Sequence, residues 1–474
     1  MRPVEVEALA PQRLESLIGP NRTQRFQETA AAARAFLAGR RVLNVNSTAS
    51  GGGVAELLQT LLAYARGVGI DTHWVVIDGD NLFFEITKRL HNRLYGAAGD
   101  GGPLGRPERA AYEKTLRANR DELVSLIQPG DIVVLHDPQT AGLARPARLA
   151  GAIVVWRCHV GRDTSNRYTD EGWAFVRPYM DDVDAYVFSR AEFIPPWVDR
   201  AHAQVIPPSI DPFSAKNQEL DQATVRSILQ YAGLLAGAAD PPTVRFSRRD
   251  GSPGRIDRRA DILQTGPPPP PEAPLVVQVS RWDRMKDMPG VLHGFVEHLD
   301  GARDAHLALV GPVVHGIADD PEAGQVLDEC IRAWRELPQA ARSRVHLACI
   351  PMHDPDENAM ITNALQRHAA VVAQKSLAEG FGLTVTEAMW KRRPIVASRV
   401  GGIAEQITDH EHGLLIDDPT DLHAFGHAVR LLLEDPDLAT RLADSAHQRA
   451  HDEYLGDRHL ERYARLFATL PERR

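Results

Sequence analysis

The segment with the most informative spacing of polar residues and glycines is KSLAEGFGLTVTEAMWKRRPIVASRVGGIAEQI, residues 375–407. A strand-like run, AAVVAQ, precedes it, and a loop with two glycines leads into a helix-like run, LTVTEAMWK. Glycine lets a backbone approach a ligand closely, and the first amides of a helix favour a phosphate. We therefore predict a ligand site made by the loop and the helix start, with these residues: Glu379, Gly380, Phe381, Gly382, Leu383 and Thr384.

The same segment contains a second carboxylate, Glu387, eight positions after Glu379 and inside the predicted helix. This spacing places the two carboxylates beside different parts of a ligand, one at a sugar and one at a ribose, each accepting hydroxyl groups. The structural alternative is that Glu379 caps a helix and Glu387 lies on a solvated helix face. The glycine pair Gly401 and Gly402, at another predicted helix start, weakens that alternative.

Two cations follow the strand-like run LVVQVS, which covers residues 275–280. Arg281 comes directly after it and Lys286 five residues later. A guanidinium fork and a compact ammonium together suit a diphosphate. The alternative is a pair of surface cations in a polar loop.

Other polar residues follow strand-like runs in the first half of the chain. His159 follows AIVVWRC, while His136 and Asp137 follow DIVVL. Ligands of open α/β sheets lie beyond the carboxyl ends of strands, so these residues are candidates for a site. The alternatives are a structural histidine, and an Asx turn in which Asp137 precedes Pro138.

A glycine loop, which includes Gly52 and Gly53, opens the helix-like run that follows RRVLNVN. It lacks the order G-x-G-x-x-G, so a dinucleotide site is not indicated. A tight turn between strand and helix is its structural alternative. The helix has one apolar face, made of Val54, Leu57, Leu58, Leu61, Leu62 and Ala65.

The elements that must position these residues alternate between β-branched runs and helix-like stretches, first over residues 41–188 and again from residue 275. This alternation predicts two α/β halves with parallel sheets. Between them, residues 221–273 are rich in Arg, Asp, Gly and Pro and include five consecutive prolines. We expect a stiff, exposed and solvated connector there.

Composition narrows the class of protein further. A length of 474 residues suits two or three domains, and a net charge of −9, from 54 Lys plus Arg against 63 Asp plus Glu, argues against nucleic-acid and membrane partners. Three widely spaced cysteines give neither a disulfide framework nor a zinc site, and no signal peptide or apolar span is evident. We expect a cytoplasmic protein, and exposed apolar helices would allow a homodimer.

The 375–407 segment resembles the retaining glycosyltransferases of family four, whose pattern is Glu-Gly-Phe-Gly-Leu followed by a second Glu at the eighth position. The resemblance implies an α/β, GT-B fold of two Rossmann-like, doubly wound parallel-sheet domains facing a deep cleft. It implies an acceptor domain at 1–220, an insert and linker at 221–273, a donor domain at 274–446 and a final helix, about 447–474, that crosses back to the first domain. The family has Gly where Asp287 and Arg392 stand, which affects the expected loop geometry but not the fold.

Motifs in the first half, VNSTASGGGVAELL, VVLHDPQ, VVWRCHV and VIPPSIDPFSAKN, are similar to those of trehalose-forming glycosyltransferring synthases. That resemblance covers most of residues 41–465 and implies transfer of glucose from a nucleoside diphosphate glucose to free glucose. It places His159 at the donor glucose, His136 and Asp137 on the acceptor side, and the glycine loop beside the donor diphosphate and the reacting sugars. The base of the nucleotide is left open.

The expected mechanism retains the anomeric configuration. No matched pair of nucleophile and acid carboxylates is evident, so we expect front-face attack by the acceptor hydroxyl, with Arg281, Lys286 and helix-start amides holding the leaving diphosphate. No Asp-x-Asp pair follows a strand, so neither a metal nor another cofactor is expected. The alternatives are a trehalose phosphorylase, another family-four sugar-nucleotide glycosyltransferase, a sugar-nucleotide epimerase of the same fold, and a nucleotide-sugar sensor without turnover.

Overall fold

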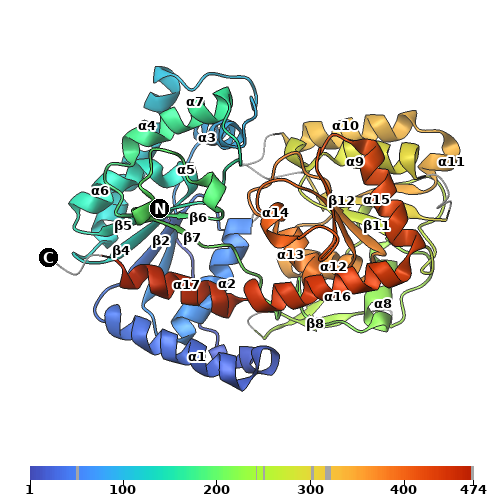
Figure 1. The fold of residues 1–474 in the computed structure, drawn as a ribbon, viewed down its shortest axis with the longest axis horizontal. Helices are drawn as coiled ribbons and strands as arrows, with labels where there is room; N and C mark the ends of the chain where they lie inside the picture. Colours follow the sequence, from blue (N-terminus) through green and yellow to red (C-terminus); the bar gives the residue numbers. More distant parts are fainter. Residues whose placement is uncertain (50–52, 242, 249–250, 300–303, 315–321, 471–474) are drawn as a thin grey trace. The chain divides into compact units, whose positions relative to one another are not determined.

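The computed structural model describes residues 1–49, 53–241, 243–248, 251–299, 304–314 and 322–470. Contacts divide the chain into two compact units (Figure 1). Unit 1 contains Met1–Ser209, Glu379–Phe381 and Tyr454–Arg474. Unit 2 contains Ile210–Ala378 and Gly382–Glu453.

Unit 1 is built on a sheet with the strand order β1-β3-β2-β4-β5-β6-β7. Its strands are parallel except β1, which pairs antiparallel with β3. Every residue of β2 and β4 is buried, as is usual for parallel strands that are covered on both faces. The strands are β1 Arg2–Pro3, β2 Val42–Asn46, β3 Thr72–Val76, β4 Ile132–His136, β5 Ile153–Cys158, β6 Ala185–Phe188 and β7 Ala203–Val205.

The helices of unit 1 include the last helix of the chain. They are α1 Glu15–Phe36, α2 Gly53–Gly67, α3 Asn81–Leu94, α4 Arg106–Leu126, α5 Asp137–Thr140, α6 Ala144–Leu149, α7 Arg167–Val176 and α17 Gly456–Ala468. Helix α17 packs on α1 and α2, and the buried Arg22 of α1 donates to Asp457 of α17 over 2.8 Å. The C-terminal segment is thus part of the first unit from Tyr454 onward. The apolar face predicted for α2 is confirmed from Leu57 to Ala65, whereas Val54 is partly exposed.

Unit 2 contains a sheet with the order β10-β13-β12-β11-β14-β15-β16, parallel except for β10. Counted along the chain from β11, the parallel strands follow the order 3-2-1-4-5-6 of a Rossmann fold. The order reverses between β11 and β14, so the loops after these two strands are where this fold binds ligands. The strands are β10 Asp261–Leu263, β11 Leu275–Val279, β12 His306–Pro312, β13 Val345–Ile350, β14 Val371–Gln374, β15 Ile395–Ser398 and β16 Leu414–Ile416.

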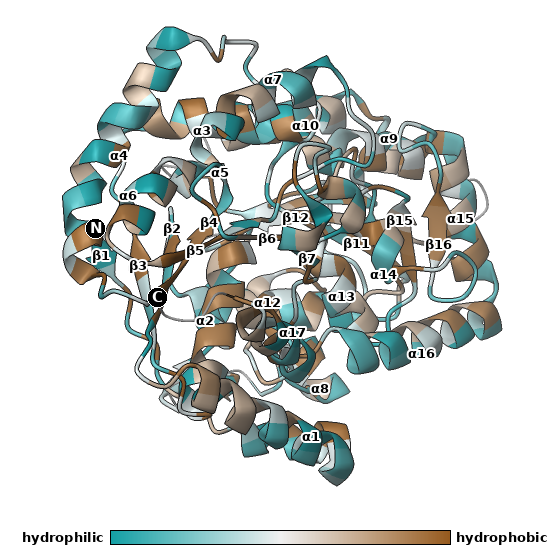
Figure 2. Ribbon diagram, turned by 60° about the vertical axis from the view of Figure 1, so that its left-hand side comes forward, coloured by the Kyte–Doolittle hydropathy of each residue, from teal (hydrophilic) through white to brown (hydrophobic). Residues whose placement is uncertain are grey.

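The helices of unit 2 connect these strands. They are α8 Gln222–Ala232, α9 Met288–His298, α10 Ala323–Glu336, α11 Gln339–Arg342, α12 Pro355–His368, α13 Leu383–Trp390, α14 Ile403–Gln406, α15 Leu422–Glu434 and α16 Pro436–Glu453. In each unit the strands are among the most hydrophobic segments, and helices such as α16 carry hydrophilic stretches (Figure 2). Among the described residues, no helix is both long enough and apolar enough to span a bilayer.

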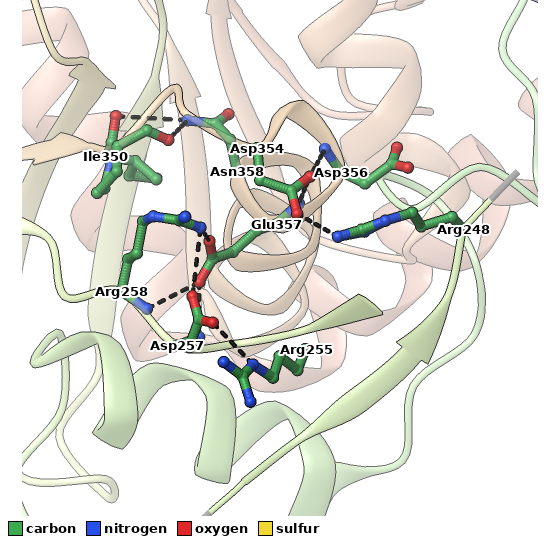
Figure 3. A network of polar contacts seen from close by, with 10 residues as sticks. Arg248, Arg255, Asp257, Arg258, Ile350, Asp354, Asp356, Glu357 and Asn358 are labelled. Atoms are coloured by element: carbon green, nitrogen blue, oxygen red, sulfur yellow. Dashed lines mark hydrogen bonds and ion pairs between the residues drawn. The ribbon is translucent and has the colours of Figure 1, made fainter. Parts of the chain in front are cut away.

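Residues 221–273 differ from the exposed connector that their composition suggests. They contain α8, a hairpin of β8 (Arg245–Ser247) and β9 (Pro253–Arg255), and β10, which pairs with β13. The buried Glu357 accepts hydrogen bonds from the backbone of Asp257 and Arg258 over 2.7 and 2.8 Å (Figure 3). Arg258 also pairs with Glu357, and Arg248 pairs with Asp354 at the start of α12. Because these carboxylates hold the segment, it is a folded part of unit 2.

Candidate active site

In unit 2, the predicted diphosphate cations lie on the loop that follows β11. Arg281 is partly exposed and its guanidinium lies 3.5 Å from Asp283. Lys286 ends the 3-10 helix Arg284–Lys286 and is also partly exposed. Both cations therefore lie at the position where the strand order reverses, which is where an anionic ligand binds in this fold.

The two residues that replace the expected glycines keep a glycine-like backbone. Asp287 has φ 47° and Arg392 has φ 52°, both in the left-handed region. Asp287 also caps α9, because its Oδ1 accepts from the N–H of Gly290 over 3.2 Å. The departures thus change the side chains at these positions while the loops retain the left-handed turn.

Helix α13 begins at Leu383, directly after Gly382, which has φ 87°. Leu383 and Thr384 are partly exposed at the helix start, and Thr384 donates to Gln374 at the end of β14 over 2.8 Å. Thus Gly382, Leu383 and Thr384 lie in unit 2, next to the strand-order reversal. The helix start predicted from sequence is confirmed.

Glu387 is not on a solvated face, because only 2% of it is exposed. Its Oε1 lies 3.3 Å from the ammonium of Lys216. Its other oxygen, Oε2, is buried and has no hydrogen-bond partner among the residues that the structure describes. A buried carboxylate oxygen without a donor costs free energy that a ligand hydroxyl would recover.

Two lysines beside Glu387 were not predicted as part of the site. Lys216 lies in the VIPPSIDPFSAKN segment, and Lys391 follows α13 one turn after Glu387. Lys391 is buried and donates to Gln366 over 2.7 Å and to Asn217 over 3.0 Å. Burial lowers the pKa of Lys391 to about 7, against the effect of the Glu387 carboxylate. Glu387 and Lys391 are four residues apart, and residues at this spacing are neighbours on a helix. The sequence alone therefore offered a signal for Lys391.

In unit 1, the ends of β4 and β5 bring His136, Asp137 and His159 together. The rings of the two histidines are stacked, with His136 Nδ1 lying 3.3 Å from His159 Nε2. The N–H of His159 donates to Asp137 Oδ1 over 2.7 Å, which joins the two strand ends. All three residues predicted at these strand ends therefore belong to one polar cluster.

The protonation of this cluster follows from its burial and from Arg157. The Nε–H of Arg157 donates to His159 Nε2 over 3.4 Å, and since a guanidinium can only donate, the ring proton of His159 lies on Nδ1. Burial, with Arg157 nearby, lowers the pKa of His159 well below its usual value and that of His136 to about 3. Burial raises the pKa of Asp137 to about 7. Both imidazoles are thus neutral at pH 7.

A further histidine of unit 1, His459 on α17, is absent from the sequence prediction. Its Nδ1 lies 2.9 Å from the hydroxyl of Ser209, and its pKa is lowered by burial and by Arg157. No motif marks His459, so only the return of the C-terminal helix to unit 1 reveals it.

The remaining predicted residues are placed as follows. Gly53 is exposed and begins α2, whereas Gly52 lies outside the described residues. Contacts group Glu379, Gly380 and Phe381 with unit 1, and Glu379 is 8% exposed.

Within the described parts of the chain, no group of three or more His, Cys, Asp or Glu side chains is arranged to hold a metal ion.

Comparison with known proteins matches two stretches of the chain to family models. Residues 44–195 match the model described as trehalose synthase, N-terminal domain, and residues 263–449 match glycosyl transferases group 1. The chain is 33% identical over 457 residues to a trehalose synthase of Pyrococcus horikoshii, covering 96% of this chain and 95% of that protein. A trehalose phosphorylase of Pleurotus pulmonarius is 23% identical over 86% of this chain and 54% of its own length.

A solved structure supports the fold independently. The α,α-trehalose-phosphate synthase (UDP-forming) from Burkholderia xenovorans, in complex with glucose-6-phosphate, superposes with a TM-score of 0.65 at 15% identity, over 91% of this chain and all of that one. The two α/β units and this likeness identify the fold as GT-B.

Proposed function

Because the chain belongs to the trehalose synthase family of glycosyltransferases, we propose that it transfers glucose from a nucleoside diphosphate glucose to free glucose, forming trehalose. In this reaction the bond between the anomeric carbon and the diphosphate oxygen breaks, and a bond to the acceptor oxygen forms. The proton of the acceptor hydroxyl passes to the leaving phosphate. The α configuration of the donor is retained in α,α-trehalose.

The observation that carries the nucleotide part of this proposal is the buried carboxylate of Glu387. Its Oε2 lacks a donor among the described residues, and Lys216 pairs with the other oxygen. A ribose hydroxyl is a donor of the right kind, and a hydrogen bond to an ionised group contributes about 1.5–3 kcal/mol. Inorganic phosphate, the co-substrate of a phosphorylase, carries no ribose to satisfy this oxygen.

The proposed leaving-group site is formed by Arg281, Lys286 and the first amides of α13. Negative charge grows on the diphosphate as the anomeric bond breaks, so donors that are fixed in place stabilise the transition state more than the ground state. Each such donor contributes up to about 3 kcal/mol. The proposal needs no carboxylate nucleophile, since the acceptor attacks from the face that the diphosphate leaves.

The sugars are proposed to meet the polar cluster of unit 1. His159 is neutral and carries its proton on Nδ1, so it suits a hydroxyl of the donor glucose as a hydrogen-bond donor. His136 and Asp137 are proposed on the acceptor side, and Glu379 and Gly380 at the donor glucose. Gly52 and Gly53 are proposed beside the diphosphate.

The test is incubation of the protein with glucose and, in turn, the ADP, UDP and GDP esters of glucose, with analysis of the products. Trehalose and a free nucleoside diphosphate in equal amounts support the proposal. Cleavage of trehalose by inorganic phosphate, but not by any nucleoside diphosphate, would instead establish the phosphorylase. Product formed without added glucose would indicate an epimerase, and tight binding without product a sensor.

The proposal requires no metal ion, because the diphosphate charge is assigned to Arg281, Lys286 and helix amides. Full activity after treatment with a chelator is therefore expected, and its complete loss would contradict this part. The proposed location is the cytoplasm, and a homodimer stays a prediction that light scattering can test.

A further inference from the structure

The loops after β11 and β14 are joined by the side chain of Gln278, which is completely buried. Its Nε2 donates to the carbonyl of Lys286 over 2.7 Å, and its Oε1 accepts from the N–H of Lys375 over 3.0 Å. The N–H of Leu377 also donates to the carbonyl of Met285 over 2.8 Å. The backbone of Lys286 is therefore fixed to the loop that leads to α13.

A second connection between these loops is an ion pair between Asp287 and Lys375. The Lys375 side chain is 0% exposed, whereas that of Asp287 is 21% exposed. A buried ammonium requires a partner of opposite charge, and removing one member of such a pair is strongly unfavourable. The carboxylate of Asp287 is thus directed toward the β14 loop.

Asp287 occupies this position at a cost in backbone conformation. Its φ of 47° and ψ of 45° lie in the left-handed region, which an aspartate adopts less readily than glycine. The same carboxylate caps α9 through Gly290 N–H, so the left-handed turn is held by both the cap and the ion pair. Since Lys286 is the preceding residue, its direction depends on this turn.

The pair also has an electrostatic consequence. A carboxylate next to a diphosphate repels it, and a neighbouring ammonium cancels most of that repulsion. With Asp287 paired to Lys375, its carboxylate no longer opposes an anionic ligand at Arg281 and Lys286. Another carboxylate of the loop, Asp283, lies 3.5 Å from the Arg281 guanidinium.

We propose that Asp287 and Lys375 form a positioning pair that orients Lys286 for the diphosphate of the donor. The proposal rests on the function proposed above, because it presumes a nucleoside diphosphate at the β11 and β14 loops. Neither residue is assigned contact with the reacting atoms. Both act through the position of Lys286 and through the local charge.

The test compares Asp287→Asn, Lys375→Met and the double variant with the wild type. Asparagine tolerates the left-handed turn and retains an oxygen for the cap, and methionine is close to lysine in length without its charge. The control is Arg284→Met on the same loop, which breaks the ion pair of Arg284 with Glu329 of α10. The measurements are the calorimetric Kd of UDP, ADP and GDP, the KM of donor and of glucose, and the melting temperature.

Each single variant is expected to raise the Kd of the nucleoside diphosphate and the donor KM about tenfold, a loss of about 1.4 kcal/mol, with the glucose KM within about twofold. The double variant should bind the nucleoside diphosphate more tightly than either single variant, because neither charge of the pair is then left without its partner. If a single variant does not fold, the double variant alone decides: a raised donor KM at unchanged glucose KM supports the proposal.

The positioning role would be overturned if folded variants kept the wild-type donor KM and nucleotide Kd, or if the donor KM and the glucose KM changed equally. It would also be overturned if the loss of affinity in the double variant equalled the sum of the losses in the two single variants. A wild type that binds none of the three nucleoside diphosphates would instead defeat the proposed function. If the wild type binds a nucleoside diphosphate and the variants bind it equally well, only the positioning role is defeated.

Discussion

The main-chain N–H of His159 donates to Oδ1 of Asp137 over 2.7 Å, which joins the ends of β5 and β4 in unit 1. Asp137 adopts this position with φ 63°, in the left-handed region. Burial outweighs the effect of this hydrogen bond and raises the pKa of Asp137 to about 7 from an ordinary value of 3.8. The carboxyl group is therefore disfavoured in its ionised form when the protein is folded.

Replacement of Asp137 by Asn should change the pH dependence of stability. Between pH 4 and 7 the folded wild type binds more protons than the unfolded chain, so the stabilising contribution of Asp137 is present at pH 4 and is lost as the pH rises through 7. Asparagine keeps the acceptor oxygen and the left-handed backbone without titrating. The free energy of unfolding of Asp137→Asn, relative to wild type, should rise by on the order of 2 kcal/mol between pH 4 and pH 8.

The measurement is urea unfolding at a series of pH values. Asp121→Asn is a suitable control, because that side chain is 79% exposed and pairs with its neighbour Arg120. If the difference in free energy of unfolding between Asp137→Asn and wild type stays constant with pH, the pKa of Asp137 is not raised by burial.

Lys286→Ala should lower turnover with a nucleoside diphosphate glucose by about a hundredfold, the effect of removing one fixed donor to a developing negative charge. The KM of glucose should change little, because the acceptor is assigned to other residues. Arg284→Ala is the matched control, since Arg284 lies in the same 3-10 helix, is exposed and pairs with Glu329. Steady-state kinetics of both variants decide, and an unchanged turnover in Lys286→Ala refutes the leaving-group role.

Glu387→Gln tests recognition of the ribose directly. Wild type should bind a 2′,3′-dideoxynucleoside diphosphate at least about tenfold more weakly than the parent nucleotide, because a hydrogen bond to the buried Oε2 is lost. Glu387→Gln should bind both ligands with similar, weaker affinity. Calorimetric titration of the four combinations measures this, and equal discrimination by wild type and variant would remove Glu387 from the ribose site.

The sequence predicted the elements whose signals are local. The apolar face of α2 repeats with helical period, and the glycines before α13 mark a helix start, so both were found where expected. Strand ends at His136 and His159 were also predictable, because polar residues follow short β-branched runs. The two α/β halves follow from the alternation of such signals along the chain.

Pairings between distant residues were not predictable from the same patterns. Glu387 meets Lys216 and Asp287 meets Lys375, but nothing in the spacing of these residues indicates the pairing. The segment 221–273 looked solvated because its arginines and prolines are typical of exposed loops. Its anchor, Glu357, lies about a hundred residues away and accepts backbone N–H groups, which have no sequence signature.

A small apolar cavity in unit 1 offers a test of the packing between α1, α2, α17 and the sheet. Its volume is about 40 Å³, and Val134 of β4 is one of the residues that line it. Val134→Ile adds one methylene into this space and should raise the free energy of unfolding by about 0.8 kcal/mol. The control is Val133→Ile, because Val133 points to the opposite face of β4, into a cluster of buried apolar side chains that includes Leu43 and Leu135. There the same methylene meets close packing and should cost about 1–3 kcal/mol, so equal effects of the two substitutions in urea unfolding would show that the cavity does not accept a side chain.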